Sequence, residues 1–338
     1  MNFFKRLQNK AYEFYCKAGT RLYYRTSPEE ILSSMISSHD VLKPGQLEDV
    51  KDQKILVLVP FKDKWDLTRS CLNSLLSQNL PQNIGLKVIL INNNSEEECT
   101  LKGVAEFQSK SSERISFERF DLPIPFNFSK INNLALEKYW DPSFQKVLLL
   151  NNDIEILDKN ALAKMASVAD SDQGIAAVGS TLLFPDRTIQ HLFVFPGSKI
   201  VGSHPFRAKD LDKGHKWFQR PQRVPAITGA LVLIDGKTLM AVGGFDDELP
   251  NCYQDVDLCL KLQKAGAGIA VVPDMKIIHY ETQTRKPVPH WREVRYIYNK
   301  WGDFLTWNPK VPKLVSRSSE ALCFDGKHRK YPWWRLYQ

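Results

Sequence analysis

The chain has 338 residues, of which 43% are hydrophobic and 25% are charged. These fractions are those of an ordinary globular protein, so they exclude a wholly disordered chain and a collagen-like repeat. The formal net charge of +8 is concentrated in residues 285–338, which carry 12 basic and 4 acidic side chains. Residues 51–284 carry 27 basic and 28 acidic side chains, so this central region lacks the basic surplus of a nucleic-acid-binding domain.

The six cysteines form no C-x-x-C pair, and a chain of this length can build a hydrophobic core without disulfides. No apolar run reaches the ~18 residues that a membrane-spanning helix requires. The N-terminus also lacks the uninterrupted apolar stretch of a signal peptide. We therefore expect a cytoplasmic protein with free thiols.

Residues 1–50 are predicted to form an amphipathic helical region followed by a linker. Apolar residues recur there at helical spacing, and the first 25 residues hold six basic side chains and one acidic side chain. Such a helix can pack its apolar face on the main domain, which is the interpretation we favour. Alternatively, it can lie on an anionic membrane surface.

The central region, residues 51–284, alternates short apolar runs with helical patterns. Residues 54–60, 86–91 and 146–150 are predicted strands, and each is followed by a predicted helix. This pattern is typical of an α/β fold with a mostly parallel sheet that is covered by helices on both faces. Because such sheets bind ligands beyond the carboxyl ends of their strands, the functional residues are expected directly after these runs.

The turns after the first two strands are polar. The first, VPFKDK (59–64), contains neither a dinucleotide-binding glycine motif nor a P-loop. The second, NNNSEEE (92–98), is rich in amides that can bind a base or ribose edge. It can equally cap a helix through Ser95 with acids in the first turn. Both roles can hold at once.

The third turn places Asn151, Asn152 and Asp153 after a buried strand. A carboxylate at this edge is a hard oxygen ligand for Mg²⁺ or Mn²⁺, and the cation could hold a diphosphate. The alternative is an acidic turn without a ligand.

The downstream region supplies further candidates. Asp255 and Asp257 lie in the first turn of a predicted helix, where either could stabilise the helix dipole. We favour that role for Asp257, whereas Asp255 could be a general base. Residues 268–280 are predicted to form one strand, which places His279 and Glu281 on the same face. A histidine there can be structural, or it can contact a metal ion or a phosphate.

These segments occur in an order that resembles bacterial family 2 glycosyltransferases. The residues are VPFKDK, INNNSEEE, FNFSKINNLA, LLLNNDIEI, LLFPDRTIQH, TGA, GGFDDELPNCYQDVDLCLKL and HYE, between residues 54 and 285. They are most similar to the branch that builds O-antigen, capsule and rhamnan polysaccharides. The resemblance implies a GT-A fold, a nucleotide-sugar donor with a UDP, dTDP or GDP moiety, a divalent cation (Mn²⁺ or Mg²⁺) and inversion at the anomeric carbon.

The resemblance also implies roles for individual residues. Those near the nucleotide sugar would be Pro60, Phe61, Asp63, Asn92, Asn93, Lys130, Asn132, Asn133, Asn152 and Asp153. Asp153 and His279 would bind the metal, and Asp255 would be the general base. The acceptor-side residues would be Gly229, Gly244, Phe245 and Asp246. The sequence departs from the family pattern at Asn151, in place of the first aspartate of a D-x-D motif, and at Gln254, in place of a glutamate.

Two alternative functions remain open at this point, as do the acceptor and the place of the C-terminal extension. A sugar nucleotidyltransferase would usually have a glycine-rich loop after the first strand, which VPFKDK lacks. A non-catalytic sugar-binding or scaffold protein is compatible with Asn151 and Gln254. The acceptor could be a glycan or a polyprenyl-pyrophosphate-linked glycan. The basic, Trp-rich extension 285–338 could fold back on the main domain or contact an anionic membrane on its cytoplasmic face.

Overall fold

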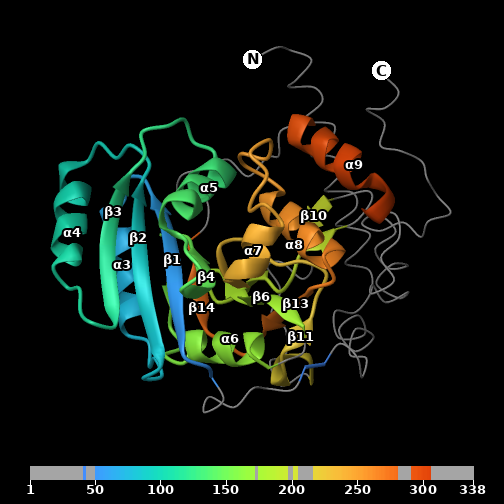
Figure 1. Cartoon of the computed structure of the whole chain (residues 1–338), viewed down its shortest axis with the longest axis horizontal. Coiled ribbons are helices and arrows are strands. Elements are labelled where there is room, and N and C mark those ends of the chain that lie inside the picture. Colours follow the sequence, from blue (N-terminus) through green and yellow to red (C-terminus); the bar gives the residue numbers. More distant parts are fainter. Residues whose placement is uncertain are drawn as a thin grey trace.

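The computed structural model describes residues 41–42, 50–171, 174–196, 201–204, 216–280 and 291–305 (Figure 1). Within these ranges the chain forms an eight-stranded sheet, a four-stranded sheet and a two-stranded sheet. The predicted amphipathic helix and the end of the C-terminal extension lie outside the described residues. No helix in the described ranges is both long enough and apolar enough to cross a membrane.

Four parallel strands form one half of the large sheet, in the order β4-β1-β2-β3. They are β1 (Gln53–Phe61), β2 (Ile84–Asn92), β3 (Ile115–Asp121) and β4 (Phe144–Leu150). They contain the three runs that the sequence predicts as strands. Because all four run in the same direction, their carboxyl ends meet at one edge of the sheet.

The other half of the large sheet is mixed. It contains β6 (Ile175–Ser180), β12 (Leu231–Asp235), β13 (Gly268–Val272) and β11 (Gln222–Arg223). The β12 strand runs antiparallel to both β4 and β6, whereas β13 is parallel to β6 and antiparallel to β11. Four of the seven strand pairings in this sheet are therefore parallel, including those on both sides of β1.

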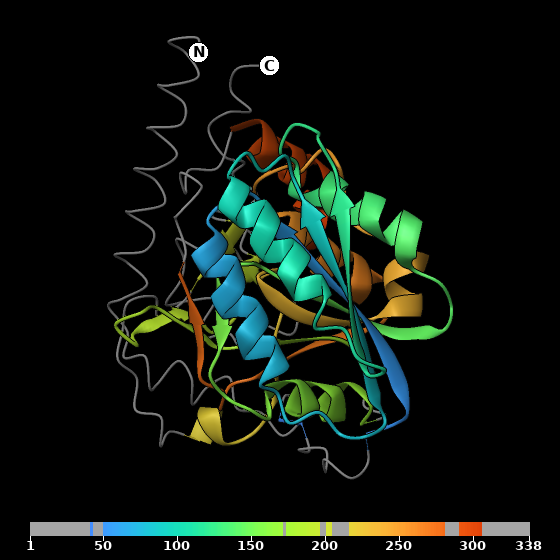
Figure 2. The ribbon, with the colours of Figure 1, turned by 90° about the vertical axis from the view of Figure 1, so that its left-hand side faces the viewer.

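Helices cover both faces of the large sheet, as the unbroken apolar strands predict. One face carries α3 (Trp65–Leu76), α4 (Glu98–Gln108) and α6 (Ala161–Ala169), with α3 and α4 side by side in Figure 2. The other carries α5 (Phe128–Tyr139), α7 (Gly236–Ala241), α8 (Gln254–Lys264) and α9 (Trp291–Leu305). Alternate residues of β1 enter the two cores, with Val57 on the first face and Leu58 on the second.

A smaller sheet in the order β5-β14-β7-β8 extends the molecule beside the end of β4. Its strands are β5 (Ile154–Ile156), β14 (Ile277–His279), β7 (Leu182–Leu183) and β8 (Ile189–His191). The single strand predicted over 268–280 is therefore wrong. It is divided into β13 and β14 at Pro273, which has no N–H to donate to a neighbouring strand. The remaining short elements are β9 (Phe195–Pro196), β10 (Val201–Ser203) and η2 (Lys216–Gln219).

The helix α9 comes from the predicted C-terminal extension but packs on the main domain. Val294, Ile297, Tyr298 and Trp301 are buried in the same core cluster as the apolar residues of α8. Residues 291–305 therefore fold back on the main domain. In Figure 1 this helix lies beside α8.

Candidate functional site

The ends of the parallel strands bring the predicted nucleotide-binding residues together. In the strand register Phe61 is opposite Asn92, and Asn92 is opposite Asp121. Phe61 is buried, and its carbonyl oxygen accepts the N–H of Asn93. Pro60, one residue earlier, is only partly buried.

Asp63 joins the turn after β1 to the turn after β2. Its Oδ1 accepts the N–H groups of Glu96 (2.8 Å) and Glu97 (2.9 Å), and its own N–H donates to Ser95 Oγ (2.9 Å). The predicted capping role of Ser95 is therefore wrong, because α4 begins at Glu98 and the Asp63 carboxylate receives the N–H groups before it. Asp63 has a left-handed backbone (φ 50°), a conformation that asparagine and aspartate tolerate better than most residues.

Asn92 and Asn93 are both buried and hydrogen-bonded. The Asn92 amide donates to Asp121 Oδ1 (2.8 Å), and its Oδ1 accepts the N–H of Ser95 (2.9 Å). Asn93 donates to the carbonyls of Leu122 (3.0 Å) and Ile124 (2.8 Å). Both amides therefore hold the turns at this edge in place, and Asp121 is the exposed carboxylate beside them. Sequence reasoning missed Asp121, although its position at the end of a parallel strand could have indicated it.

A second group, which we call the metal corner, consists of Asp153, His279 and Gln190. Asp153 Oδ1 lies 3.2 Å from His279 Nε2, and the two side chains are 17% and 12% exposed. They meet because β14 pairs antiparallel with β5, which places His279 opposite Ile154. The N–H of Tyr280 also donates to the carbonyl of Asp153 (3.0 Å). Asn152 points elsewhere, donating to Thr68 Oγ1 (2.9 Å).

The metal corner fits a divalent cation. Asp153 Oδ1 is buried and accepts no hydrogen bond from the described part of the chain. Neighbouring ligand atoms around an octahedral Mg²⁺ at ~2.1 Å would lie roughly 3 Å apart, close to the separation of the two side-chain atoms. In the described ranges no three His, Cys, Asp or Glu side chains gather at one such point. Two candidate ligands are a number compatible with a divalent cation that also binds substrate phosphate and water.

A third group, the base corner, is formed by Asp255 and Gly229. Asp255 is in the first turn of α8, where its Oδ2 accepts the N–H of Gly229 (3.2 Å) and its Oδ1 accepts that of Val256 (2.8 Å). A Cβ added to Gly229 would meet Asp255 Cβ at 3.6 Å and the Phe128 ring at 3.7 Å, so this backbone lies close to both side chains. Asp255 remains partly exposed.

The base corner is directly linked to the turn that carries Asp153. The N–H of Asn151 donates to the carbonyl of Ala230 (2.9 Å), at the point where β12 pairs with β4. Asp153 is two residues beyond Asn151, and Gly229 immediately precedes Ala230. The candidate metal ligand and the candidate base thus belong to one continuous edge of the sheet.

Asp257 contacts α9 rather than acting only on the helix dipole. Its side chain is fully buried, with Oδ1 at 2.7 Å from both Trp301 Nε1 and Lys300 Nζ and Oδ2 at 3.7 Å from Lys261 Nζ. The predicted dipole role is therefore incomplete: Asp257 lies in the first turn of α8, but its buried charge is neutralised by two lysines. Burial lowers the pKa of Lys261 despite the nearby Asp257 carboxylate.

The predicted acceptor-side turn is also held by α9. Lys300 Nζ pairs with Asp246 Oδ2, which accepts a second hydrogen bond from Tyr296 OH (2.9 Å). Burial alone would raise the pKa of Asp246, but hydrogen bonds from Lys300, Glu248 N–H and Tyr296 hold the pKa below its ordinary value. The same lysine has a raised pKa, because Asp246 and Asp257 outweigh the effect of its burial.

Another α9 contact lies just before α8. Glu293 is buried, and its Oε2 accepts the N–H groups of Asn251 (3.0 Å) and Cys252 (2.6 Å). Tyr253, the next residue, has a left-handed backbone (φ 67°) at the start of α8. We call Glu293, Tyr296, Lys300 and Trp301 the α9 clasp, because they contact the chain on both sides of Asp255.

The segment predicted near the donor contacts the turn that is predicted on the acceptor side. Asn133 donates to the carbonyl of Phe245 (3.0 Å) and accepts its N–H (2.9 Å), next to Gly244, which has a left-handed backbone (φ 58°). Asn132 is buried and donates to the carbonyl of Phe128 within α5 (2.8 Å). Lys130 is exposed in the first turn of that helix.

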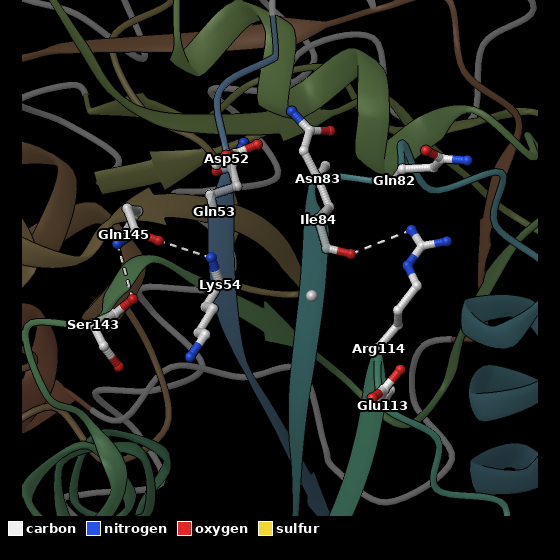
Figure 3. A pocket seen from close by; sticks show the side chains of 11 residues that line it. Asp52, Gln53, Lys54, Gln82, Asn83, Ile84, Glu113, Arg114, Ser143 and Gln145 are labelled. Atoms are coloured by element: carbon white, nitrogen blue, oxygen red, sulfur yellow. Dashed lines mark hydrogen bonds between the residues drawn. The ribbon is translucent and has the colours of Figure 1, made fainter.

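A hollow of about 650 Å³ lies elsewhere, at the amino ends of the parallel strands (Figure 3). Its lining includes Lys54, Arg114 and Gln145. The Arg114 guanidinium donates to the carbonyl of Ile84 (3.3 Å), and Gln145 accepts the N–H of Lys54 (2.7 Å). Ligands of parallel sheets bind at the opposite edge, so this hollow is separate from the candidate site.

A comparison with protein families matches residues 53–295, more than half of the chain, to the family described as Glycosyltransferase like family 2. The chain belongs to glycosyltransferase family 2. The match includes the metal corner, the base corner and the first residues of α9. The family that the order of motifs predicts is therefore confirmed.

The family 2 chain is 31% identical over 238 residues to the O-antigen biosynthesis protein RfbC of Myxococcus xanthus. That match covers 69% of this chain but 18% of RfbC, so the chain spans less than a fifth of that relative.

Two solved structures have a similar fold. One is the mannosyltransferase PcManGT from Pyrobaculum calidifontis in complex with GDP-Man and Mn²⁺, with a TM-score of 0.59 and 14% identity over 93% of this chain and 79% of that one. The other is GalNAc-T7 with UDP, GalNAc and Mn²⁺, with a TM-score of 0.59 and 14% identity over 92% of this chain and 66% of that one. The family 2 chain thus has the predicted GT-A fold.

Sequence reasoning missed the side chains that support the two corners. Gln190 lies in a quoted segment, LLFPDRTIQH, but no role is predicted for it. The α9 clasp lies beyond the predicted end of the catalytic domain at residue 284. The contacts of Gln190 and of the α9 clasp join residues that are far apart in the sequence, so they become visible only in the folded structure.

Proposed function

We propose that this chain is an inverting glycosyltransferase of bacterial surface polysaccharide synthesis. It would move a sugar from a nucleotide-sugar donor to a hydroxyl of a glycan or lipid-linked glycan acceptor. The observation that supports this most is the link between Asn151 and Ala230, which joins a candidate metal ligand and a candidate base at one sheet edge. Membership of glycosyltransferase family 2 supports the reaction class.

Asp255 is proposed as the general base. Its carboxylate is fixed by the N–H groups of Gly229 and Val256 and remains partly exposed, so an acceptor hydroxyl can approach it. Removing the hydroxyl proton as the oxygen attacks typically contributes ~10²–10⁴-fold to such a reaction. Attack from the side opposite the leaving group, in one displacement, would invert the anomeric centre.

Asp153 and His279 are the proposed metal ligands. A divalent cation bound there supplies positive charge that neutralises the leaving nucleoside diphosphate. The Mn²⁺ in the PcManGT and GalNAc-T7 structures supports a cation of this kind. The two protein ligands leave room for diphosphate oxygens of the donor.

The turns around Asp63, Asn92 and Asp121 are the proposed site for the nucleotide. They lie at the carboxyl ends of β1, β2 and β3, where a parallel sheet binds its ligands. Asp121 offers a carboxylate to N–H groups of the base or to ribose hydroxyls. The GDP and UDP moieties in the two similar structures support a nucleotide-sugar donor without selecting the base.

The name of RfbC supports an acceptor in O-antigen synthesis, although this chain spans 18% of that protein. The acceptor side would include Gly244, Phe245 and Asp246. The basic residues of the terminal segments support attachment to an anionic membrane surface, where a lipid-linked acceptor would be located.

A panel of UDP-, GDP- and dTDP-sugars tests the proposal. Donor binding is measured by thermal shift, because a ligand that binds the folded state raises the apparent stability. Donor hydrolysis and transfer are then measured with and without Mn²⁺. We expect one donor to bind and to be turned over only with the cation. Binding without turnover, with or without the cation, would instead indicate a non-catalytic sugar-binding protein.

A further inference from the structure

Gln190 has a buried side-chain amide that, among the described residues, makes both of its hydrogen bonds with His279. It lies in β8, is 2% exposed, and donates from Nε2 to the backbone carbonyl of His279 (3.1 Å). Its Oε1 lies 2.6 Å from Nδ1 of the same histidine. The side chain thus holds both the main chain and the ring of His279.

The first of these bonds determines the orientation of the amide. A carbonyl oxygen can only accept, so the atom of Gln190 that faces the His279 carbonyl must be the NH₂ group. The amide oxygen then faces Nδ1. Because that oxygen can only accept, Nδ1 must carry a hydrogen.

The position of this hydrogen defines the other side of the ring. In a neutral imidazole with hydrogen on Nδ1, Nε2 has a lone pair and can bind a metal ion. Here Nε2 faces Asp153 Oδ1 at 3.2 Å, and this oxygen accepts no hydrogen bond from the described residues. In this tautomer two electron-rich atoms face each other, and a cation bound by both would relieve their mutual repulsion.

We propose that Gln190 is a positioning residue that holds His279 in the tautomer protonated on Nδ1, which leaves Nε2 available to bind a divalent cation together with Asp153. The proposal rests on the metal-dependent transfer proposed above. It assigns to Gln190 the role that outer hydrogen-bond partners play at many metal sites, where they fix the tautomer and orientation of a histidine ligand.

Packing alone does not account for an amide at this position. The backbone of β8 already pairs with β7 through Ile189 and His191, so the strand does not depend on the Gln190 side chain. An apolar side chain of similar size could fill the space without the need to satisfy buried polar atoms. Without Gln190, the Asp153 carboxylate would be the nearest acceptor for a ring hydrogen. That hydrogen would move to Nε2, and the two metal ligands would bind each other.

Three variants separate these roles. Gln190→Leu removes both hydrogen bonds. Gln190→Glu keeps an acceptor for Nδ1–H and loses the donor to the His279 carbonyl. The matched control is Gln222→Leu, because Gln222 is also buried and donates to backbone carbonyls, those of Trp217 and Arg220.

The tautomer is read directly by nitrogen NMR of the metal-free protein, at a pH that keeps the imidazole uncharged. A His279→Gln variant assigns the resonance. We expect hydrogen on Nδ1 in the wild type, in Gln190→Glu and in Gln222→Leu, and hydrogen on Nε2 in Gln190→Leu. Circular dichroism shows whether each variant is folded.

Affinity for Mn²⁺ is measured by calorimetry and by electron paramagnetic resonance, alone and with UDP or GDP. We expect Gln190→Leu to bind Mn²⁺ ~10–100-fold more weakly, which is the usual effect of losing such a partner. Gln190→Glu and the control should remain close to the wild type.

The results distinguish this inference from the proposed function. If the wild type binds Mn²⁺ but the tautomer and the affinity do not change in Gln190→Leu, the inference is overturned and the proposed function stands. If the tautomers follow the expected pattern but the wild type does not bind Mn²⁺ with any nucleotide, the metal dependence of the proposed function is overturned.

Discussion

The metal corner and the base corner lie at the same sheet edge but are held in different ways. In the metal corner, strand pairing between β5 and β14 and the neutral amide of Gln190 position Asp153 and His279. In the base corner, Asp255 lies in the first turn of α8 after an irregular loop, and the α9 clasp contacts that region mainly through charged side chains. Backbone pairing depends little on pH or on any one side chain, whereas buried ion pairs depend on both partners.

The largest effect is expected at the reacting atoms. Asp255→Asn keeps the shape of the side chain but removes the proposed base, so transfer should fall by ~10²–10⁴-fold. Donor binding, measured by thermal shift, should remain near that of the wild type, because Asp255 contacts Gly229 and Val256 rather than the predicted nucleotide turns. Transfer that continues at the wild-type rate would show that another group is the base.

The next effect concerns the α9 clasp. Lys300→Met leaves Asp257 fully buried without its closest cation, so the free energy of unfolding in urea should fall by roughly 3 kcal/mol. The control is Lys102→Met, which breaks the exposed pair with Glu98 and should cost less than about 0.5 kcal/mol. If the two variants lose the same free energy of unfolding, the buried pair contributes no more stability than an exposed one. Mn²⁺ affinity should not change in either variant.

A smaller effect is expected from removing one hydrogen bond to a partly exposed carboxylate beside the metal corner. Tyr280→Phe loses the bond from its hydroxyl to Glu155 (2.7 Å) and should destabilise the fold by about 1 kcal/mol. The N–H of Tyr280 still donates to the carbonyl of Asp153, so Mn²⁺ affinity should remain that of the wild type. A loss of affinity in calorimetry would show that side chains, and not only strand pairing, hold this corner.

The smallest effect is a change with pH that arises where Asp246 contacts the α9 clasp. The pKa of Asp246 is lowered in the folded protein, so its stabilisation is present above the ordinary value of 3.8 and is lost as the pH falls through the folded pKa. Urea unfolding should therefore show wild type more stable than Asp246→Asn at neutral pH, with the difference shrinking in strong acid. A difference that is constant at all pH values would contradict the contribution of the Asp246 charge.

The local features of the fold could be predicted from the sequence. Buried strands such as 146–150 and the polar turns after them are visible because burial on both faces selects unbroken apolar runs. Asp153 and Asp255 follow from such turns once the order of motifs is seen. The division at Pro273 was missed, because the apolar pattern continues on both sides of it.

The supporting contacts could not be predicted, because they join residues that are distant in the sequence. Gln190 and His279 are 89 positions apart, and Asp246 and Lys300 are 54 apart. No periodicity connects such pairs. The same reason explains why the contacts of Asp257 were missed. Its place in the first turn of α8 indicated an interaction with the helix dipole, but the sequence did not show that α9 covers it.

The position of α9 has a consequence for the order in which the protein matures during its synthesis. Domains form as the chain emerges from its amino end, and every residue of the metal corner is made before residue 280. Asp255 is also synthesised before α9. The buried Asp257 carboxylate gains its hydrogen bond from Trp301, and the loop before α8 gains its contact with Glu293, only once α9 has been made. A growing chain that ends before α9 would contain the proposed metal ligands, whereas the region around the proposed base would still lack the contacts that α9 provides. The contacts around the proposed base are therefore complete only after α9 has been synthesised and has packed on α8.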